Sequence, residues 1–284
     1  MLKKIFFAAA LLLASELIAK PVVIASIAPV EYLAKAVGGD KIEVQSLAKG
    51  DVHSYEPKPN DMKAVAKARI FIAAGLEFEE AWIPRFKASA KNLVVVKSDA
   101  KIAKLKEERG EQAEHDKKHE AHADPHVWLN PMLAITMARN ISDALIDMDK
   151  ANKDFYLENF QKLMNDLLAF DESAKESLAG LKNRKFVVYH PAWGYFAAHY
   201  DLEQISIERS GKEPKIDEMA STLKMIKDEN IKVIFADPNR SQKSAQVLAS
   251  QTGAKVELLD PLGYNLLENL KIAVGAIKDA NSPK

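Results

Sequence analysis

The chain has 284 residues, a length that suits two medium domains or one large one. Hydrophobic residues make up 48% and charged residues 28%, an ordinary globular balance, and the formal net charge of +0 gives no indication of nucleic-acid binding. The absence of cysteine excludes disulfides, thiolate metal sites and cysteine nucleophiles. Any metal site must therefore use His, Asp and Glu, a ligand set that suits zinc or manganese better than copper(I).

Residues 1–19 have the pattern of a secretory signal peptide. A basic start is followed by an apolar stretch at 5–13 and by an acceptable cleavage site at Ala19. The alternative is a membrane anchor, but Glu16 ends the apolar run well short of the roughly 20 residues that a span requires. We expect cleavage near Ala19 and export to a bacterial periplasm, with no membrane insertion of the mature chain.

Residues 20–150 alternate between β-branched runs and helical patterns, which indicates a parallel sheet covered by helices. Asn60 is the predicted N-cap of one helix, and Pro131 begins another at a first-turn position where its missing N–H costs nothing. A His-rich loop at 111–125 interrupts the pattern. The predicted strands are 21–26, 42–47, 69–74 and 93–96, and the predicted helices are 29–37, 61–68, 78–90 and 131–148.

A long helix is predicted at 151–181, because this stretch has no Gly or Pro before Gly180 and its apolar residues follow one helical stripe. At 1.5 Å per residue the helix runs roughly 40 Å, which is longer than one domain layer needs. The βα pattern restarts in 182–284. Strands are predicted at 186–189, 202–207, 231–236 and 255–259, and helices at 193–200, 216–229, 241–252 and 266–278. The predicted fold is α/β: two lobes, each a roughly four-stranded parallel sheet with helices on both faces, joined by the long helix.

Four of the 7 histidines lie close together, and imidazole is the commonest side-chain metal ligand. His126 lies between two prolines and precedes an apolar run, as at the edge of a folded body, whereas His115, His119 and His122 lie among charged residues. We interpret His126 as a fixed ligand and the other three as weak accessory ligands in a mobile loop. The alternative is a charged surface loop, because a His-rich tract alone is a compositional hint.

Open α/β sheets bind ligands at the carboxyl ends of their strands. His53 follows the second predicted strand, His126 lies beyond the fourth, His190 follows the first strand of the second lobe, and Asp260 follows its last strand. Three imidazoles and one carboxylate, two from each lobe, form a tetrahedral N/O set that suits Zn²⁺ in a cleft between the lobes. Each has a structural alternative: His53 as a turn residue, His190 as a core histidine, and Asp260 as a turn starter before Pro261.

Neighbouring residues suggest further roles. His199 lies among apolar and aromatic residues and is interpreted as structural. Glu208 and Asp237 are candidates to accept the second N–H of a ligating imidazole. Three aromatic residues flank the candidate ligands and either exclude water or belong to the core: Trp128, Trp193 and Tyr55.

Five motifs run along nearly the whole mature chain: DVHSYEP at 51–57, DPHVWLNP at 124–131, YHPAWGY at 189–195, GKEP at 211–214 and LDPL at 259–262. In these motifs the chain resembles the zinc- and manganese-binding solute-binding proteins of bacterial ABC importers, and most closely the periplasmic zinc-binding members. The resemblance implies two lobes, one long connecting helix and a metal held in the cleft.

By this resemblance, His53, His126 and His190 match the family's three leading metal positions, and Asp260 matches its fourth, acidic position. Relatives of the manganese type usually have Glu at the third position, so His190 favours zinc. The His-rich loop before the second ligand is typical of the zinc branch, although here it is short. Some members of that branch fill the fourth place with water or another acid.

The expected function is capture of Zn²⁺ in the periplasm by a monomer that delivers the ion to an inner-membrane ABC permease, with no chemistry on the ion. One alternative is a Mn²⁺-binding protein of the same family. Another is an exported zinc hydrolase with a metal-activated water, in which Asp260 is the base. The absence of a further paired carboxylate or nucleophile motif argues against the hydrolase. Because a long helix resists wide hinge closure, we expect only small lobe shifts on metal binding.

Overall fold

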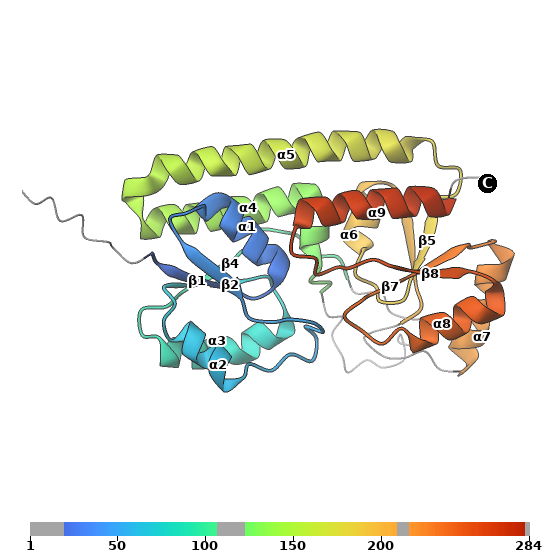
Figure 1. The fold of residues 1–284 in the computed structure, drawn as a ribbon, viewed down its shortest axis with the longest axis horizontal. Helices are drawn as coiled ribbons and strands as arrows, with labels where there is room; N and C mark the ends of the chain where they lie inside the picture. The colour runs from blue at the N-terminus through green and yellow to red at the C-terminus, as the bar shows by residue number, and fades with distance from the viewer. Residues whose placement is uncertain (1–19, 107–122, 209–215, 282–284) are drawn as a thin grey trace, which may run out of the picture.

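The computed structural model describes residues 20–106, 123–208 and 216–281, which form two parallel four-stranded sheets set along the long axis of the molecule (Figure 1). The first sheet has the order β2-β1-β3-β4 and the second the order β6-β5-β7-β8. The first comprises β1 (Val22–Ala25), β2 (Glu43–Ser46), β3 (Ile70–Ala73) and β4 (Val94–Lys97). The second comprises β5 (Lys185–Val188), β6 (Glu203–Ser206), β7 (Val233–Ala236) and β8 (Lys255–Leu258).

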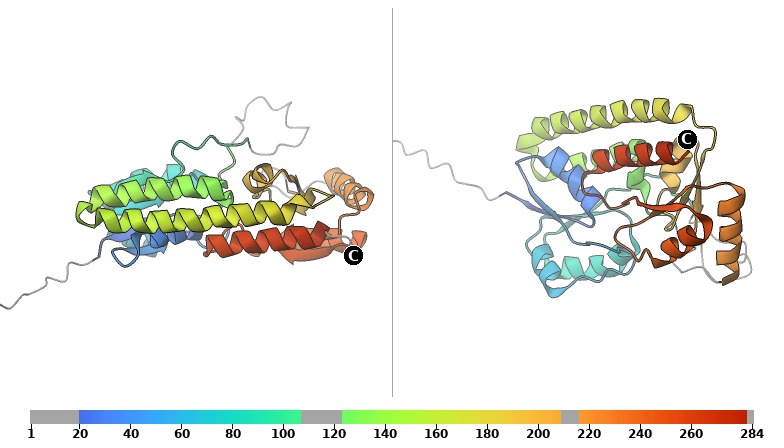
Figure 2. Two further views of the ribbon diagram at one scale, coloured as in Figure 1. Left: turned by 90° about the horizontal axis from the view of Figure 1, so that it is seen from above. Right: turned by 45° about the vertical axis from the view of Figure 1, so that its right-hand side comes forward.

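Helices cover both faces of each sheet, which confirms the predicted fold class. One face of the molecule carries α1 (Ala28–Gly38), α4 (Pro131–Met148), α5 (Lys153–Ala179), α6 (Gly194–His199) and α9 (Leu266–Asn281). The opposite face carries α2 (Pro59–Val65), α3 (Glu77–Ser89), α7 (Ile216–Asp228) and α8 (Lys243–Thr252). The helix α5 has 27 residues and runs along both lobes beside α4 and α9 (Figure 2).

Alternate residues of the central strands enter different cores, as the two-residue period of a strand requires. Val23 and Ala25 of β1 pack into the core below α1, α4, α5 and α9, whereas Ile24 packs toward α2 and α3. Phe186 of β5 enters the same first core, and Val187 faces α7 and α8. The core below α5 is therefore continuous through both lobes, and we call it the shared core; the two cores on the opposite face are separate.

The start of α2 differs from the prediction. Lys58, and not Asn60, is the N-cap, and Asn60 lies inside the helix. Pro59 has the fixed φ that suits a first helical position, and the Asp61 carboxylate accepts the Lys58 N–H at 2.8 Å, so the helix begins two residues earlier than predicted. In α4 the predicted role of Pro131 is confirmed, since Pro131 occupies the first turn.

Several predictions fall outside the described residues: the signal peptide, the GKEP motif, and the accessory ligands His115, His119 and His122. The lobe boundaries at 150/151 and 181/182 stay predictions. Within the described part of the chain, no helix combines the length and the apolar character needed to cross a bilayer.

Candidate metal centre

Three imidazoles from both lobes meet at the carboxyl ends of the strands. His53 lies in the loop after β2, His126 directly before a short 3₁₀ turn (Val127–Leu129), and His190 after β5. One possible ligand atom from each lies within 4.8 Å of the others, and the Nε2 atoms of His53 and His190 are 3.2 Å apart. Ring centroids are 5.0 to 5.7 Å apart. The structure thus brings together three of the four predicted ligands.

Aspartate turns present the loops at this edge of the sheets. Asp51 Oδ1 accepts the backbone N–H of His53 at 3.1 Å, and Asp124 Oδ1 accepts that of His126 at 2.9 Å. These contacts span two residues, which is the pattern of an Asx turn. The same spacing recurs after β7 and β8, where Asp237 accepts from Asn239 and Asp260 from Leu262.

Asp260 lies outside the three-histidine group among the described residues. Its Oδ1 accepts the Leu262 N–H and an amide hydrogen of Asn239, both at 2.8 Å. The carboxylate is thus engaged as a turn starter, which is the structural alternative that the sequence left open. Its role as a fourth ligand stays a prediction.

Carboxylates hold two of the three rings. Asp124 Oδ1 lies 2.7 Å from Nδ1 of His126, and Glu208 Oε2 lies 3.1 Å from Nδ1 of His190; all four side chains are buried. A carboxylate can only accept, so each favours a proton on Nδ1 and leaves the Nε2 lone pair toward the centre. The structure agrees with the expectation for Glu208. The other candidate, Asp237, instead accepts two hydrogen bonds from Asn239.

The sequence reasoning did not find Asp124 or Arg240 as partners of the imidazoles. Arg240 Nη1 lies 2.7 Å from Nδ1 of His190, and its Nη2 donates to Glu208 Oε1 at 3.0 Å. A signal existed for both: Asp124 stands two residues before a candidate ligand, and Arg240 follows the end of β7 at the same sheet edge.

The surroundings keep the imidazoles of His53 and His190 neutral. Desolvation, followed by the charges of His126 and Arg240, lowers the pKa of His53 from 6.5 to about 4. The pKa of His190 is lowered well below its ordinary value, chiefly by burial and then by the same two neighbours. Although His53 is exposed as a residue, its ring packs against the other two imidazoles. Formation of the imidazolium at His53 and His190 therefore competes only weakly with binding of a cation.

The other flanking residues belong mainly to the packing. Trp128 and Trp193 are fully buried in the shared core, and Trp128 Nε1 donates to the carbonyl oxygen of Pro261 at 2.8 Å. His199 Nε2 lies 2.6 Å from Oδ1 of Asp171 on α5, away from the three-histidine group. That hydrogen bond ties α6 to the long helix, as expected of a structural histidine.

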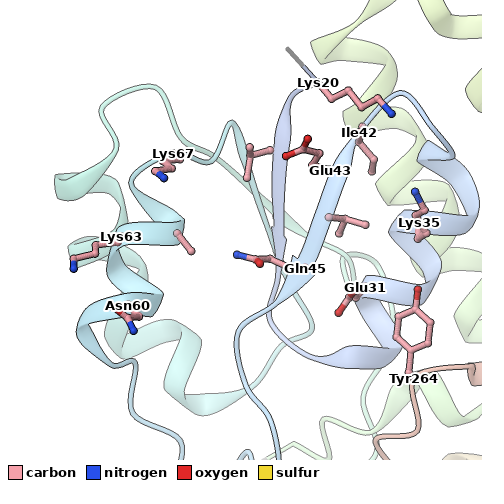
Figure 3. Close-up of a pocket in the computed structure, with 13 residues that line it drawn as sticks. Lys20, Glu31, Lys35, Ile42, Glu43, Gln45, Asn60, Lys63, Lys67 and Tyr264 are labelled. Atoms are coloured by element: carbon pink, nitrogen blue, oxygen red, sulfur yellow. The ribbon is translucent and has the colours of Figure 1, made fainter.

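A separate hollow of about 750 Å³ lies beside the edge strand β2, between α1 and α2 (Figure 3). Four lysines and two glutamates lie among its lining residues: Lys20, Lys35, Lys63, Lys67, Glu31 and Glu43. It contains none of the three histidines, and Glu31 is engaged by the N–H and hydroxyl of Ser46. Among the described residues, the three-histidine group lies at the sheet ends and not in this hollow.

Comparison with known proteins places this arrangement in a family. Residues 23–280 match the family model for the periplasmic component A of zinc-uptake complexes. The chain is 30% identical over 279 residues to the high-affinity zinc uptake system protein ZnuA of Bacillus subtilis (strain 168), covering 91% of this chain and 86% of that protein. A crystal structure of ZnuA superposes with a TM-score of 0.87 at 35% identity, covering 93% of this chain and all of that chain (100%).

A second solved structure is described as a ZnuA deletion mutant with zinc bound; it superposes with a TM-score of 0.86 at 34% identity and covers 93% of this chain and 99% of that one. The family consists of solute-binding proteins of metal uptake, and the prediction that the chain is not an enzyme is confirmed by its membership. The chain belongs to the family of periplasmic components A of zinc-uptake complexes.

Proposed function

We propose that the protein captures one Zn²⁺ with the Nε2 atoms of His53, His126 and His190. The observation that carries this proposal is the convergence of three imidazoles from two lobes, two of which, His53 and His190, have lowered pKa values. Two nitrogens bound to one tetrahedral zinc lie about 3.4 Å apart, since each Zn–N bond is about 2.0–2.1 Å long. The 3.2 Å between the Nε2 atoms of His53 and His190 is close to that separation.

The donor set favours zinc over manganese. Three imidazole nitrogens suit a borderline cation, whereas Mn²⁺ prefers sites richer in carboxylate, carbonyl and water oxygens. The buried carboxylates Asp124 and Glu208 contact the imidazoles through Nδ1. They raise the basicity of the ligating nitrogens.

We propose Asp260 as the fourth ligand, which would close the coordination shell as expected of a site that holds an ion. Its position after β8, at the same sheet edge as His190, supports this assignment. Ligation requires the carboxylate to rearrange, because Oδ1 is held by Asn239 and Leu262. A water molecule in the fourth place is the competing arrangement.

The family description and the predicted leader support a role in delivery. We propose that the chain is exported after cleavage near Ala19, acts as a monomer in the periplasm, and passes Zn²⁺ to an inner-membrane ABC permease. The family description as a component of a zinc-uptake complex supports this role. So does the name of the Bacillus subtilis relative, a zinc uptake system protein.

A competition titration of the metal-stripped protein with Zn²⁺ and Mn²⁺ tests the proposal. We expect tight binding of one Zn²⁺ per chain and clear preference over Mn²⁺. Each of His53→Ala, His126→Ala and His190→Ala should weaken that binding by about a hundredfold or more. His199→Ala is the matched control and should retain the affinity, since His199 pairs with Asp171. A preference for Mn²⁺ would overturn the argument from the imidazoles.

The accessory histidines are tested separately. We propose that His115, His119 and His122 bind additional Zn²⁺ weakly and raise its concentration near the cleft. Deleting 115–122 removes all three histidines and retains Lys106 and Ala123, the partners of a β-bridge. We expect fewer weakly bound ions and an unchanged tight site; loss of the tight site would contradict the division between the loop and His126.

A further inference from the structure

Two groups of opposite hydrogen-bonding character contact the same nitrogen of His190. Nη1 of Arg240 lies 2.7 Å from Nδ1, and Oε2 of Glu208 lies 3.1 Å from it. Arg240 and Glu208 also bind each other, Nη2 to Oε1, at 3.0 Å. Glu208 and His190 are buried, and the Arg240 side chain is 17% exposed. The three side chains therefore form one packed cluster directly behind the imidazole.

Chemistry prevents both contacts from being hydrogen bonds of the same neutral ring. A guanidinium can only donate, so its bond to Nδ1 requires a lone pair there and places the ring proton on Nε2. An ionised carboxylate can only accept, so its bond requires the proton on Nδ1 and leaves the lone pair on Nε2. Arg240 and Glu208 thus favour opposite tautomers of His190.

The two tautomers differ at the atom that faces the metal centre. Nε2 of His190 lies 3.2 Å from Nε2 of His53. With the proton on Nε2, His190 donates to His53, and neither nitrogen offers a lone pair to a cation. With the proton on Nδ1, the Nε2 lone pair of His190 points toward the centre and the ring is a competent ligand.

We propose that Arg240 is a positioning residue that acts through His190 to weaken metal binding and speed release, by stabilising the tautomer that cannot ligate. The inference rests on the proposed capture of Zn²⁺. Glu208 is its counterpart and stabilises the ligating tautomer. The positive charge of Arg240, held behind the ligand, acts in the same direction because it disfavours a second cation nearby.

Such a device suits a carrier whose cargo must leave. Arg240 belongs to the short Asx-turn loop after β7, where its backbone N–H donates to the carbonyl oxygen of Asp237. If the Arg240 side chain moves away, Glu208 remains as the hydrogen-bond partner of Nδ1, and the sheets need not change. When only a fraction of molecules has the competent tautomer, the apparent dissociation constant rises in inverse proportion to that fraction.

The first test replaces the guanidinium. Arg240→Met should lower the dissociation constant for Zn²⁺ by about tenfold and slow dissociation correspondingly. Lys243→Met is the matched control. Lys243 is exposed at the start of α8, three residues after Arg240, so the substitution removes a nearby positive charge without touching His190. Glu208→Gln should weaken binding. An unchanged or weaker affinity in Arg240→Met would overturn the proposal.

The second test reads the tautomer itself and needs no metal. Ring ¹⁵N chemical shifts of the unsubstituted protein, stripped of metal, should show the proton of His190 on Nε2, and Arg240→Met should move it to Nδ1. A proton on Nδ1 in the unsubstituted protein, or no movement in the variant, would refute the tautomer mechanism even if affinity rose through charge alone. Failure of the unsubstituted protein to bind Zn²⁺ would instead refute the proposed function.

Discussion

The hydroxyl of Tyr195 donates a 2.8 Å hydrogen bond to the backbone carbonyl oxygen of Asp124, although the two residues lie in different lobes. The same hydroxyl accepts the backbone N–H of Leu105 at 2.8 Å, and the Asp124 N–H donates to the Leu105 carbonyl. The helix α6 thus fastens the two segments that flank 107–122. Because Asp124 also contacts Nδ1 of His126, this set of hydrogen bonds connects α6 to the metal centre.

Tyr195→Phe should therefore lower both stability and affinity. Removing the buried hydroxyl leaves the Leu105 N–H and the Asp124 carbonyl without this partner, which costs about 1–3 kcal/mol of unfolding free energy. We expect severalfold weaker Zn²⁺ binding as Asp124 loosens. Urea unfolding and competition titration measure the two effects. Tyr264→Phe is the control, because Tyr264 is largely exposed; equal stability of the two variants would contradict the argument.

Asp124→Asn should weaken Zn²⁺ binding by about 10- to 100-fold, the usual effect of losing a carboxylate behind a metal-bound histidine. The amide keeps the turn but removes the negative charge 2.7 Å from Nδ1 of His126. Asp51→Asn is a close control, since Asp51 accepts the backbone N–H of His53 and the hydroxyl of Ser54 rather than an imidazole N–H. A competition titration that shows equal losses in both variants would refute the role given to the Asp124 charge.

The metal-stripped protein should become less stable on acidification. The folded-state pKa of His53 is about 4 and that of His190 is also lowered, whereas an unfolded histidine titrates near 6.5. Between these values the unfolded chain binds more protons, so the free energy of unfolding decreases as pH falls from about 6.5 toward 4. Denaturant titrations at several pH values measure the slope. The variant His53→Gln, His190→Gln should have a flatter profile; an identical slope would exclude these imidazoles as its source.

The shared core should make the two lobes unfold together. Leu167 of α5 is fully buried in that core, so Leu167→Ala should lower the free energy of unfolding by about 2–5 kcal/mol. We expect one thermal unfolding transition at a lower temperature, rather than two separate transitions. The neighbouring Leu168 is 37% exposed and provides a matched control, for which a much smaller loss is expected. Calorimetry with two resolved transitions would contradict the coupling of the lobes.

The same core restricts domain motion. We expect solution scattering to show almost no change in the radius of gyration when Zn²⁺ is added, because α5 and its apolar contacts span both lobes. The changes should instead be confined to the loops that carry His53, Arg240 and Asp260. A large rigid-body closure would contradict this expectation.

The positions of strands and helices could be predicted from the sequence, because they depend on the local pattern of apolar and polar residues. β3 is apolar at every position and buried at every position, and α5 has the uninterrupted stripe that places it against the shared core. The convergence of His53, His126 and His190 was also accessible, since parallel strands place their carboxyl ends at one edge.

What the sequence could not provide depends on side-chain direction. Asp260 stands at the predicted strand end, but its Oδ1 is used by Asn239 and Leu262, and no pattern reveals that choice. Arg240 follows a strand as many surface arginines do, and only the packed structure shows its guanidinium beside Nδ1 of His190. At α2, a proline at the first helical position outweighed the N-cap propensity of Asn60.

The aspartate turns have an evolutionary consequence. In each turn the aspartate accepts the backbone N–H of the residue two positions later, so this bond requires no particular side chain there. His53, His126, Asn239 and Leu262 occupy that place. Substituting that residue exchanges a donor for the cation without disturbing strand pairing or the shared core. A scaffold of this kind can acquire a new metal preference through single substitutions, because its fold is stabilised by other residues, those of the sheets and the shared core.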